Sequence, residues 1–189
     1  MQRRLYGTIG NDASMKKLFY LAAAVFASDV SAATMTASVV TIHDGYTVTV
    51  VDAAKKQHKV RLAGIDAPDL KQAYGPQSKQ NLSKLVLKKT VVVDWSTRDR
   101  NKRIIGKIML DETGADCAFR SCIKSLDAGL QQIRDGFAWH NKQYEPEQSP
   151  EDRTRYAAAE AKAKTAKTGL WADEKPVPPW EWRAQRKKR

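Results

Sequence analysis

Five stretches of the chain carry β-branched and apolar residues in short alternating or continuous runs, the pattern typical of β-strands. The predicted strands span residues 38–43, 47–52, 58–65, 90–95 and 103–110. Residues 53–56, Ala-Ala-Lys-Lys, form the expected turn between the second strand and the third. Five short strands with helices between them favour an α+β fold built on a five-stranded OB-type β-barrel.

Three further segments repeat apolar residues at helical spacing. The predicted helices span residues 76–88, 125–134 and 150–167. The third has the clearest boundaries, because Ser149 is a good N-cap, Pro150 suits the first helical position and Gly169 is a natural stop. Its predicted buried stripe is mostly alanine, which implies close packing against the barrel.

The N-terminal region has the pattern of an export signal. Lys16 and Lys17 precede the apolar run 18–27, and Val30-Ser-Ala32 ends it with small residues. The run is short for a membrane span, and a buried helix of the domain is the alternative. We therefore expect residues 1–32 to be an N-terminal extension and signal peptide, with Met1 or Met15 as the true start. The protein would then be periplasmic or secreted, with no stable membrane insertion after removal of the signal.

The C-terminal segment differs from the rest of the chain in composition. Residues 176–189 are rich in proline, then in tryptophan, then in basic residues. Prolines favour an extended tail on the surface. Trp180 and Trp182 could stack on bases, although packing of these rings on the domain is the favoured interpretation. The predicted organisation is therefore a signal region, a domain over residues 33–175, and this tail.

Charge narrows the class of partner. The chain has 189 residues, 42% of them hydrophobic and 29% charged, with a net charge of +12 and a pI near 9.7. Such a balance favours polyanionic partners, nucleic acid above all and anionic membrane surfaces less specifically. Removal of residues 1–32 leaves it strongly basic.

Cysteine usage agrees with export. Cys117 and Cys122 are the two cysteines of the chain and stand five positions apart. An oxidising compartment would favour a disulfide between them, and two free thiols are the alternative. A zinc site is disfavoured, because there is no second cysteine pair and the three histidines are scattered.

Two short motifs place arginines among carboxylates. The first is Arg61-Leu-Ala-Gly-Ile-Asp66-Ala67-Pro68-Asp69, and the second runs from Asp99 to Arg103. The planar guanidinium holds phosphate through paired charged hydrogen bonds. Neighbouring carboxylates make chemical sense if one holds a cation and another activates water. Taken singly, each motif has an ordinary alternative: an ion pair of Arg61 with Asp66, a turn at 66–69, and a solvated hairpin tip at 99–102.

The order and spacing of these motifs resemble the staphylococcal nuclease (thermonuclease) family over about residues 38–171. The resemblance implies catalytic roles for Arg61 and Arg103, and a general-base role for Asp69, where the family has glutamate. It implies that Asp66, the Ala67 carbonyl and, through water, Asp44 hold Ca²⁺. It also implies an SNase-like OB fold and hydrolysis of DNA or RNA with low sequence specificity, leaving a 3′-phosphate. We expect a monomer that favours single-stranded or locally melted nucleic acid.

One position departs from the family pattern. The motif Asp-Gly-Asp-Thr reads Asp44-Gly45-Tyr46-Thr47 here, so a tyrosine stands where the family has a direct calcium ligand. A hard cation needs six to eight oxygens, preferably charged. We therefore expect Ca²⁺ to bind weakly, below the affinity of a Tyr46→Asp variant. The sequence leaves three classes open: a nuclease, a nucleic-acid-binding module of the same fold that does not cut, and a basic envelope protein.

Overall fold

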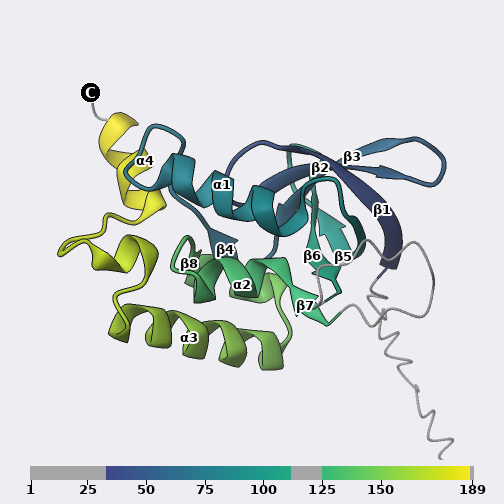
Figure 1. Cartoon of the computed structure of the whole chain (residues 1–189). Helices are drawn as coiled ribbons and strands as arrows, with labels where there is room; N and C mark the ends of the chain where they lie inside the picture. The colour runs from purple at the N-terminus through teal and green to yellow at the C-terminus, as the bar shows by residue number, and fades with distance from the viewer. Residues whose placement is uncertain (1–32, 112–124, 188–189) are drawn as a thin grey trace, which may run out of the picture.

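The computed structural model describes residues 33–111 and 125–187 and contains a closed β-barrel. The five long strands pair in the order β3-β2-β1-β5-β6, and a parallel pairing of β3 with β6 closes the barrel (Figure 1). Closure leaves no long unpaired edge. The strands are β1 (Ala33–Ile42), β2 (Thr47–Asp52), β3 (Gln57–Leu62), β5 (Thr90–Arg98) and β6 (Ile104–Leu110). The prediction of a five-stranded OB-type barrel in an α+β fold is confirmed.

Alternating burial along the strands explains why this pattern forms a barrel. Val39, Val48, Val60, Val91 and Ile108 are buried and belong to one core cluster. In β1 and β5 buried residues alternate with more exposed ones, as a half-buried strand requires, whereas β2 is buried over Thr47–Val50. β1 bends where its register with β2 shifts between Val39 and Thr41, so one strand pairs with both β2 and β5.

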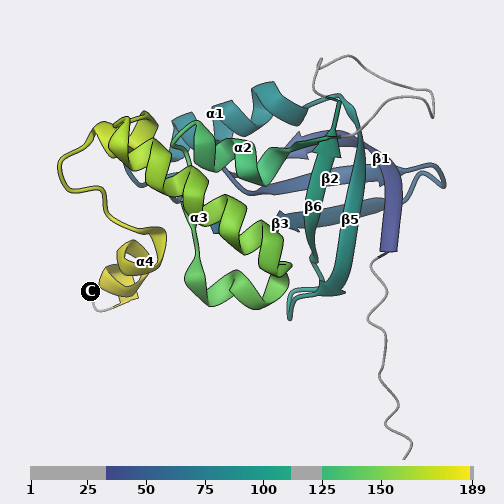
Figure 2. The same ribbon diagram turned by 90° about the horizontal axis from the view of Figure 1, so that it is seen from below.

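Three helices lie to one side of the barrel (Figures 1 and 2). They are α1 (Gly75–Val86), α2 (Ala128–Arg134) and α3 (Pro150–Thr165), and α2 packs against both of the others. The helix predicted at 150–167 agrees closely with α3: the Ser149 hydroxyl accepts from the Asp152 N–H at 3.1 Å, and Tyr156, Ala159 and Ala163 are buried. The predicted start of the helix at 125–134 is three residues too early, because Asp127 is the N-cap of α2.

Short elements connect these helices to the barrel. β4 (Ile65–Asp66) pairs with β8 (Trp139–His140), and β7 (Leu126–Asp127) pairs with the end of β6. Two 3₁₀ segments, η1 (Lys142–Glu147) and η2 (Gly169–Ala172), flank α3. Asp66, the central carboxylate of the first motif, therefore lies in a two-residue strand outside the barrel sheet.

The C-terminal segment is helical, so the prediction of an extended tail is wrong for most of it. α4 (Pro179–Lys187) begins at the last of the prolines, where the N–H groups of Glu181 and Trp182 donate to the Pro178 carbonyl. Proline is well tolerated at the start of a helix, since its missing N–H would have no partner there. The favoured packing of the tryptophans is confirmed: Trp180 meets Trp139 edge-to-face at 6.4 Å.

Asp127 joins α2 to α3 and gives a first testable prediction. Its carboxylate accepts from the N–H groups of Gly129 and Leu130 and from the Tyr156 hydroxyl at 2.8 Å, all in buried positions. Asp127→Ala removes a helix cap and leaves a buried hydroxyl without an acceptor, so it should lower the free energy of unfolding by about 2–4 kcal/mol. Urea unfolding measures this. Tyr156→Phe, which removes only one bond, should cost less; equal losses would contradict the capping role.

No helix in the described ranges has the length and apolar character needed to cross a membrane. The predicted signal peptide at 1–32 and the predicted disulfide between Cys117 and Cys122 lie outside the described residues.

Candidate active site

Arg61 lies near the end of β3 on the outer face of the barrel. It is only 3% exposed. One amino group, Nη2, donates to Oε1 of Glu147 in η1, and the guanidinium lies 4.4 Å from the centre of the Tyr144 ring. Glu147 is fixed in turn, because its Oε2 accepts from the Gly64 N–H at 3.2 Å. The segment before α3 thus orients Arg61.

Two buried polar atoms near Arg61 lack hydrogen-bond partners among the described residues. They are Nη1 of Arg61 and Oγ1 of Thr47. Arg61 and Thr47 are direct register partners on β3 and β2, so both atoms belong to one small area. Buried polar atoms are nearly always paired. Two neighbouring donors without acceptors therefore indicate a place where an anionic oxygen would bind.

Arg103 lies at the other end of the same area, at the close of the turn between β5 and β6. Its Nε donates to Oδ2 of Asp99 at 2.7 Å, and its backbone N–H donates to Oδ1 at 3.0 Å. Burial is the largest single effect and disfavours the charge, but the hydrogen bond to Asp99 together with the charges of Asp99, Tyr46 and Asp44 raises the pKa of Arg103. The hydrogen bonds to Asp99 thus fix this turn, for which a solvated hairpin tip was the alternative interpretation, and hold the charged guanidinium in place.

A pocket of about 330 Å³ joins these groups. Its volume is at the lower end of the range for ligand sites, roughly 300–1,000 Å³. The lining residues come from the β1–β2 turn, β2, β3 and the β5–β6 turn: His43, Asp44, Thr47, Lys59, Asn101 and Arg103. Asp44 accepts from the Tyr46 N–H at 2.9 Å, which holds its carboxylate in the turn. The turn at Asp44–Thr47 and the second motif, far apart in sequence, therefore line one basic pocket, and Arg61 of the first motif is the register partner of Thr47.

Asp66 and Asp69 lie beside a side chain that the motif analysis did not include. Arg183 of α4 donates from Nη2 to Oδ2 of Asp66 at 2.5 Å and from Nη1 to Oδ1 of Asp69 at 3.1 Å. The Asp66 side chain is 0% exposed, against 28% for Asp69 and 35% for Arg183. Burial raises the pKa of Asp66, and the bonds from Arg183 offset only part of that effect.

Tyr46 is affected by the charges of Asp44 and Arg103 at the basic pocket and by the charges of Asp66 and Arg183. It is half-buried and packs against the barrel core. Burial, followed by the nearby charges of Asp66 and Asp44, raises the pKa of Tyr46 to about 12, and Arg183 and Arg103 act in the opposite direction. The phenol is therefore neutral at pH 7 and does not replace the charge of an aspartate.

The carboxylate oxygens of this site do not fit the calcium ion that the resemblance implies. Both oxygens of Asp66 accept from Arg183, and Oδ1 also accepts from the Ala67 N–H at 3.0 Å. Within the described ranges, no three acidic, histidine or cysteine side chains are grouped as a metal site would need. Ca²⁺ needs several unpaired oxygens at once, and here a guanidinium already pairs with them.

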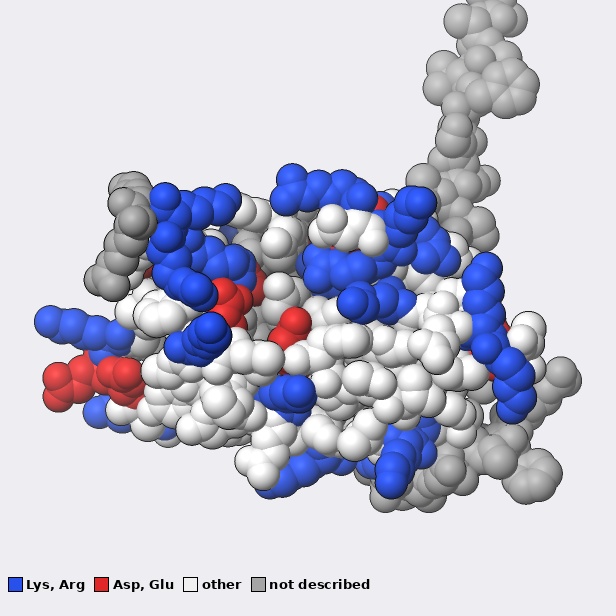
Figure 3. Space-filling view, turned by 90° about the horizontal axis from the view of Figure 1, so that it is seen from above, with Lys and Arg blue, Asp and Glu red and all other residues white. Residues whose placement is uncertain are grey.

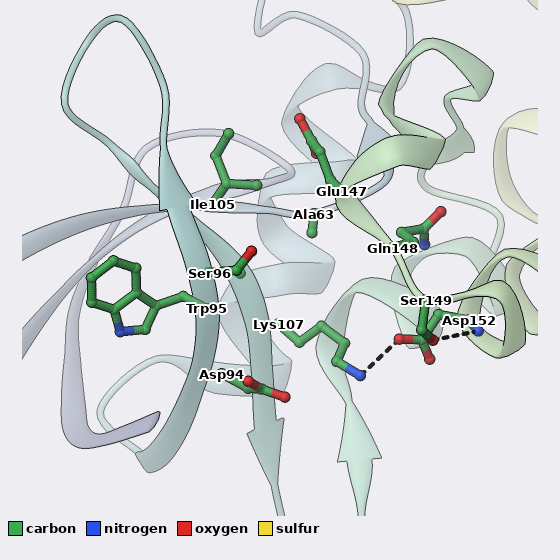
Figure 4. A pocket seen from close by; sticks show the side chains of 11 residues that line it. Ala63, Asp94, Trp95, Ser96, Ile105, Lys107, Glu147, Gln148, Ser149 and Asp152 are labelled. Atoms are coloured by element: carbon green, nitrogen blue, oxygen red, sulfur yellow. Dashed lines mark hydrogen bonds and ion pairs between the residues drawn. The ribbon is translucent and has the colours of Figure 1, made fainter. Parts of the chain in front are cut away.

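A second pocket, of about 200 Å³, lies beyond Glu147 and is a weaker candidate (Figure 4). Its most prominent charged groups satisfy each other, because Nζ of Lys107 donates to Oδ2 of Asp152 at 2.8 Å. Glu147 lines its other end. Since no free cation faces this pocket among the residues that line it, it does not compete with the Arg61–Arg103 region for a phosphate.

Basic side chains also gather on the face that appears when the molecule of Figure 1 is viewed from above. Figure 3 shows Lys and Arg over much of this face, with a few carboxylates among them. The basic side chains on this face attract a polyanion such as nucleic acid.

Comparisons with known proteins agree with this geometry. The sequence profile described as staphylococcal nuclease homologue matches residues 59–173, which include both arginine motifs. The chain belongs to the staphylococcal nuclease family. It is 35% identical over 152 residues to a Haemophilus influenzae protein named uncharacterized endonuclease, covering 80% of this chain and 75% of the relative. An Escherichia coli protein of the same name is 33% identical over 169 residues, covering 89% and 98%.

The structure brings the predicted site residues of this family member into two neighbouring groups. Arg61 is next to Thr47, which lines the pocket together with Asp44 and Arg103. Asp66 and Asp69 accept hydrogen bonds from Arg183, and the Ala67 N–H donates to Asp66. The motif analysis missed Arg183 and Glu147. Arg183 stands in Pro-Pro-Trp-Glu-Trp-Arg, a segment whose unusual tryptophans already marked it as packed on the domain.

Proposed function

We propose that the protein is a nuclease that hydrolyses phosphodiester bonds of DNA and/or RNA with low sequence specificity. One observation carries the proposal: Arg61 and Thr47 present adjacent buried donors that have no acceptor among the described residues, and Thr47 and Arg103 line the same pocket. A phosphate oxygen would satisfy both donors. Membership of a nuclease family supports the same activity in general.

The two arginines would supply electrostatic stabilisation. Negative charge grows on the phosphoryl oxygens as water attacks, so guanidinium groups fixed in advance bind the transition state more strongly than the ground state. Arg61 is held by Glu147 and Arg103 by Asp99. Neither arginine then needs to reorganise when the substrate arrives.

Asp69 would accept the proton of the attacking water. Its Oδ1 faces Arg183, while Oδ2 has no hydrogen bond within the described part of the chain, and the side chain is 28% exposed. The water oxygen bonds to phosphorus and its proton passes to Oδ2. The bond from phosphorus to the 5′ oxygen breaks, leaving a 3′-phosphate, and the 5′ oxygen takes up a proton from solvent.

A binding module that does not cut is the second candidate. Tyr46 in place of an aspartate and the pairing of Asp66 with Arg183 favour it. Such a module would keep the basic face and both arginines but release no products. Its DNA affinity would fall steeply with salt, because phosphate contacts release counterions.

A cleavage assay separates the two candidates. Plasmid DNA, single-stranded DNA and RNA are incubated with the protein in three buffers: Ca²⁺, chelator and neither. Products in any buffer that disappear with Arg61→Ala support the nuclease. Salt-sensitive gel retardation without products in all three selects the binding module. Calcium assistance, which the family resemblance implies, is tested by the same three buffers.

We further propose that the protein is exported and that Cys117 and Cys122 then form a disulfide. A charged region, an apolar run and Ser31-Ala32 occur in the order of a signal peptide. Mass spectrometry of protein from the producing cell should find a mature form that begins near Ala33 and lacks labelled thiols under denaturing, non-reducing conditions. A mature form retaining residues 15–32 would contradict export, and two labelled cysteines would contradict the disulfide.

A further inference from the structure

Arg183 takes the position that a metal ion would need at Asp66. Its guanidinium donates to both oxygens of Asp66, at 3.4 Å and 2.5 Å, and to Asp69 at 3.1 Å. Burial is the largest single effect and opposes the charge of this group, but the hydrogen bonds to Asp66 and Asp69 together with the charges of Asp66 and Tyr46 raise the pKa of Arg183. One fixed positive charge therefore already neutralises the buried carboxylate.

Tyr46, in the turn between β1 and β2, fits this arrangement. A tyrosine at position 46 removes one negative charge from the place where the resemblance implies a calcium ligand. A guanidinium in place of Ca²⁺ removes one positive charge. The two changes compensate, so the net charge of the cluster stays the same. The charge of Arg183 also acts on the Tyr46 phenol and opposes part of the rise in its pKa, so the two residues belong to one cluster.

The helix that carries Arg183 is anchored rather than loosely laid on the site. Nε2 of Gln72 donates to the Val177 carbonyl at 2.5 Å, just before α4 begins. Pro179 is buried, and Trp180 contacts Trp139 of β8, the strand that pairs with β4. Asp66 and the base of α4 are thus fixed to the same two-stranded sheet. These contacts indicate that α4 is a permanent part of the site and not a removable cover.

Arg183 retains donors for a substrate. Its contacts with Asp66 and Asp69 leave Nε and one hydrogen of Nη2 without partners among the described residues. The side chain is 35% exposed, so these donors can meet a phosphate oxygen. Tyr46 links this region to the basic pocket, because its N–H donates to Asp44, which lines the pocket, and the charges of Arg183 and Arg103 both act on its phenol.

We propose that Arg183 is the built-in cation of the phosphodiester site: it occupies the place of a divalent metal ion and contacts the scissile phosphate directly. The proposal rests on the nuclease function for its second half. Its first half concerns cation binding alone and can be measured without activity. Cleavage by this protein is then independent of Ca²⁺ and depends on a residue of the C-terminal helix.

Calorimetry tests the first half. Wild type should show no calcium binding up to about 10⁻³ M, the weak end of protein calcium sites. The double variant Tyr46→Asp/Arg183→Ala frees Asp66 and restores a second carboxylate, so it should bind Ca²⁺. Calcium binding by wild type, or none by the double variant when circular dichroism shows it folded, would overturn the assignment. Tyr46→Asp/Arg183→Gln serves as a second version should the first not fold.

Cleavage rates test the second half. Wild-type turnover should stay within twofold when Ca²⁺ is replaced by chelator. Arg183→Ala should lower turnover on the order of a hundredfold, and added guanidinium at low millimolar concentration should restore part of it, which a purely structural residue would not show. Arg186→Ala, an exposed arginine on the same helix, is the matched control. Arg183→Ala turnover equal to or above wild type would overturn the catalytic role.

The two proposals fail in different ways. If wild type cleaves only with Ca²⁺, the nuclease function stands and the role of Arg183 falls. If wild type cleaves in none of the buffers, the nuclease function falls and with it the catalytic role. The calorimetric comparison then still decides whether Arg183 occupies the cation position.

Discussion

Arg61→Ala should lower the turnover of nucleic-acid cleavage by on the order of a hundredfold or more, with little change in DNA affinity. Nη1 of Arg61 is a buried donor whose partner is missing within the described residues, so its strongest bond would form with the substrate. That bond strengthens as the phosphoryl group gains charge. Nonspecific affinity instead comes from many exposed basic residues, of which Arg61 is not one.

Three controls make the Arg61 result interpretable. Arg134→Ala removes an exposed arginine from α2 and should leave turnover unchanged. Arg61→Lys keeps the charge but lacks the planar fork that bonds Glu147, so it should recover only part of the loss. Urea unfolding shows whether Glu147, left without its partner, destabilises the variant. A folded Arg61→Ala protein within a few-fold of wild-type turnover would reject this site.

The barrel could be predicted from the sequence because its signals are local. Each long strand carries its own alternating or continuous run of apolar residues, and residues of these runs such as Val48, Val50 and Val60 are buried in the core. The helix at 150–165 has its cap and its stop within the same segment. Arg61 and Arg103 were predictable for a different reason, since the spacing of short motifs matched a known family.

The contacts that define the site could not be predicted, because they join residues far apart in the chain. Arg183 reaches Asp66 across 117 positions, and Glu147 reaches Arg61 across 86. Their elements are also short: β4 has two residues, too few for any periodicity. The prolines at the start of this segment favoured an extended tail. Packing of Trp180 on Trp139 stabilises the folded segment, however, and an extended tail would lose this contact.

Removal of residues 176–189, the predicted tail, should lower the free energy of unfolding by on the order of 3–5 kcal/mol. The Asp66 side chain is fully buried, and truncation takes away the charge that compensates it. The same cut removes the Trp180–Trp139 contact and the bond between Gln72 and the Val177 carbonyl. Urea unfolding of the truncated and full-length chains gives the difference, provided that both unfold in a single transition.

Two matched variants separate the contributions to this loss. A chain that lacks only residues 188–189 should be as stable as the full chain, since α4 ends at Lys187. Asp66→Asn in the truncated chain replaces the buried charge with a neutral amide and should recover part of the lost stability. Recovery would identify the uncompensated carboxylate as the main cost, which makes α4 an integral part of the domain. Unchanged stability after truncation would instead confirm residues 33–175 as a complete unit and the helix as an accessory.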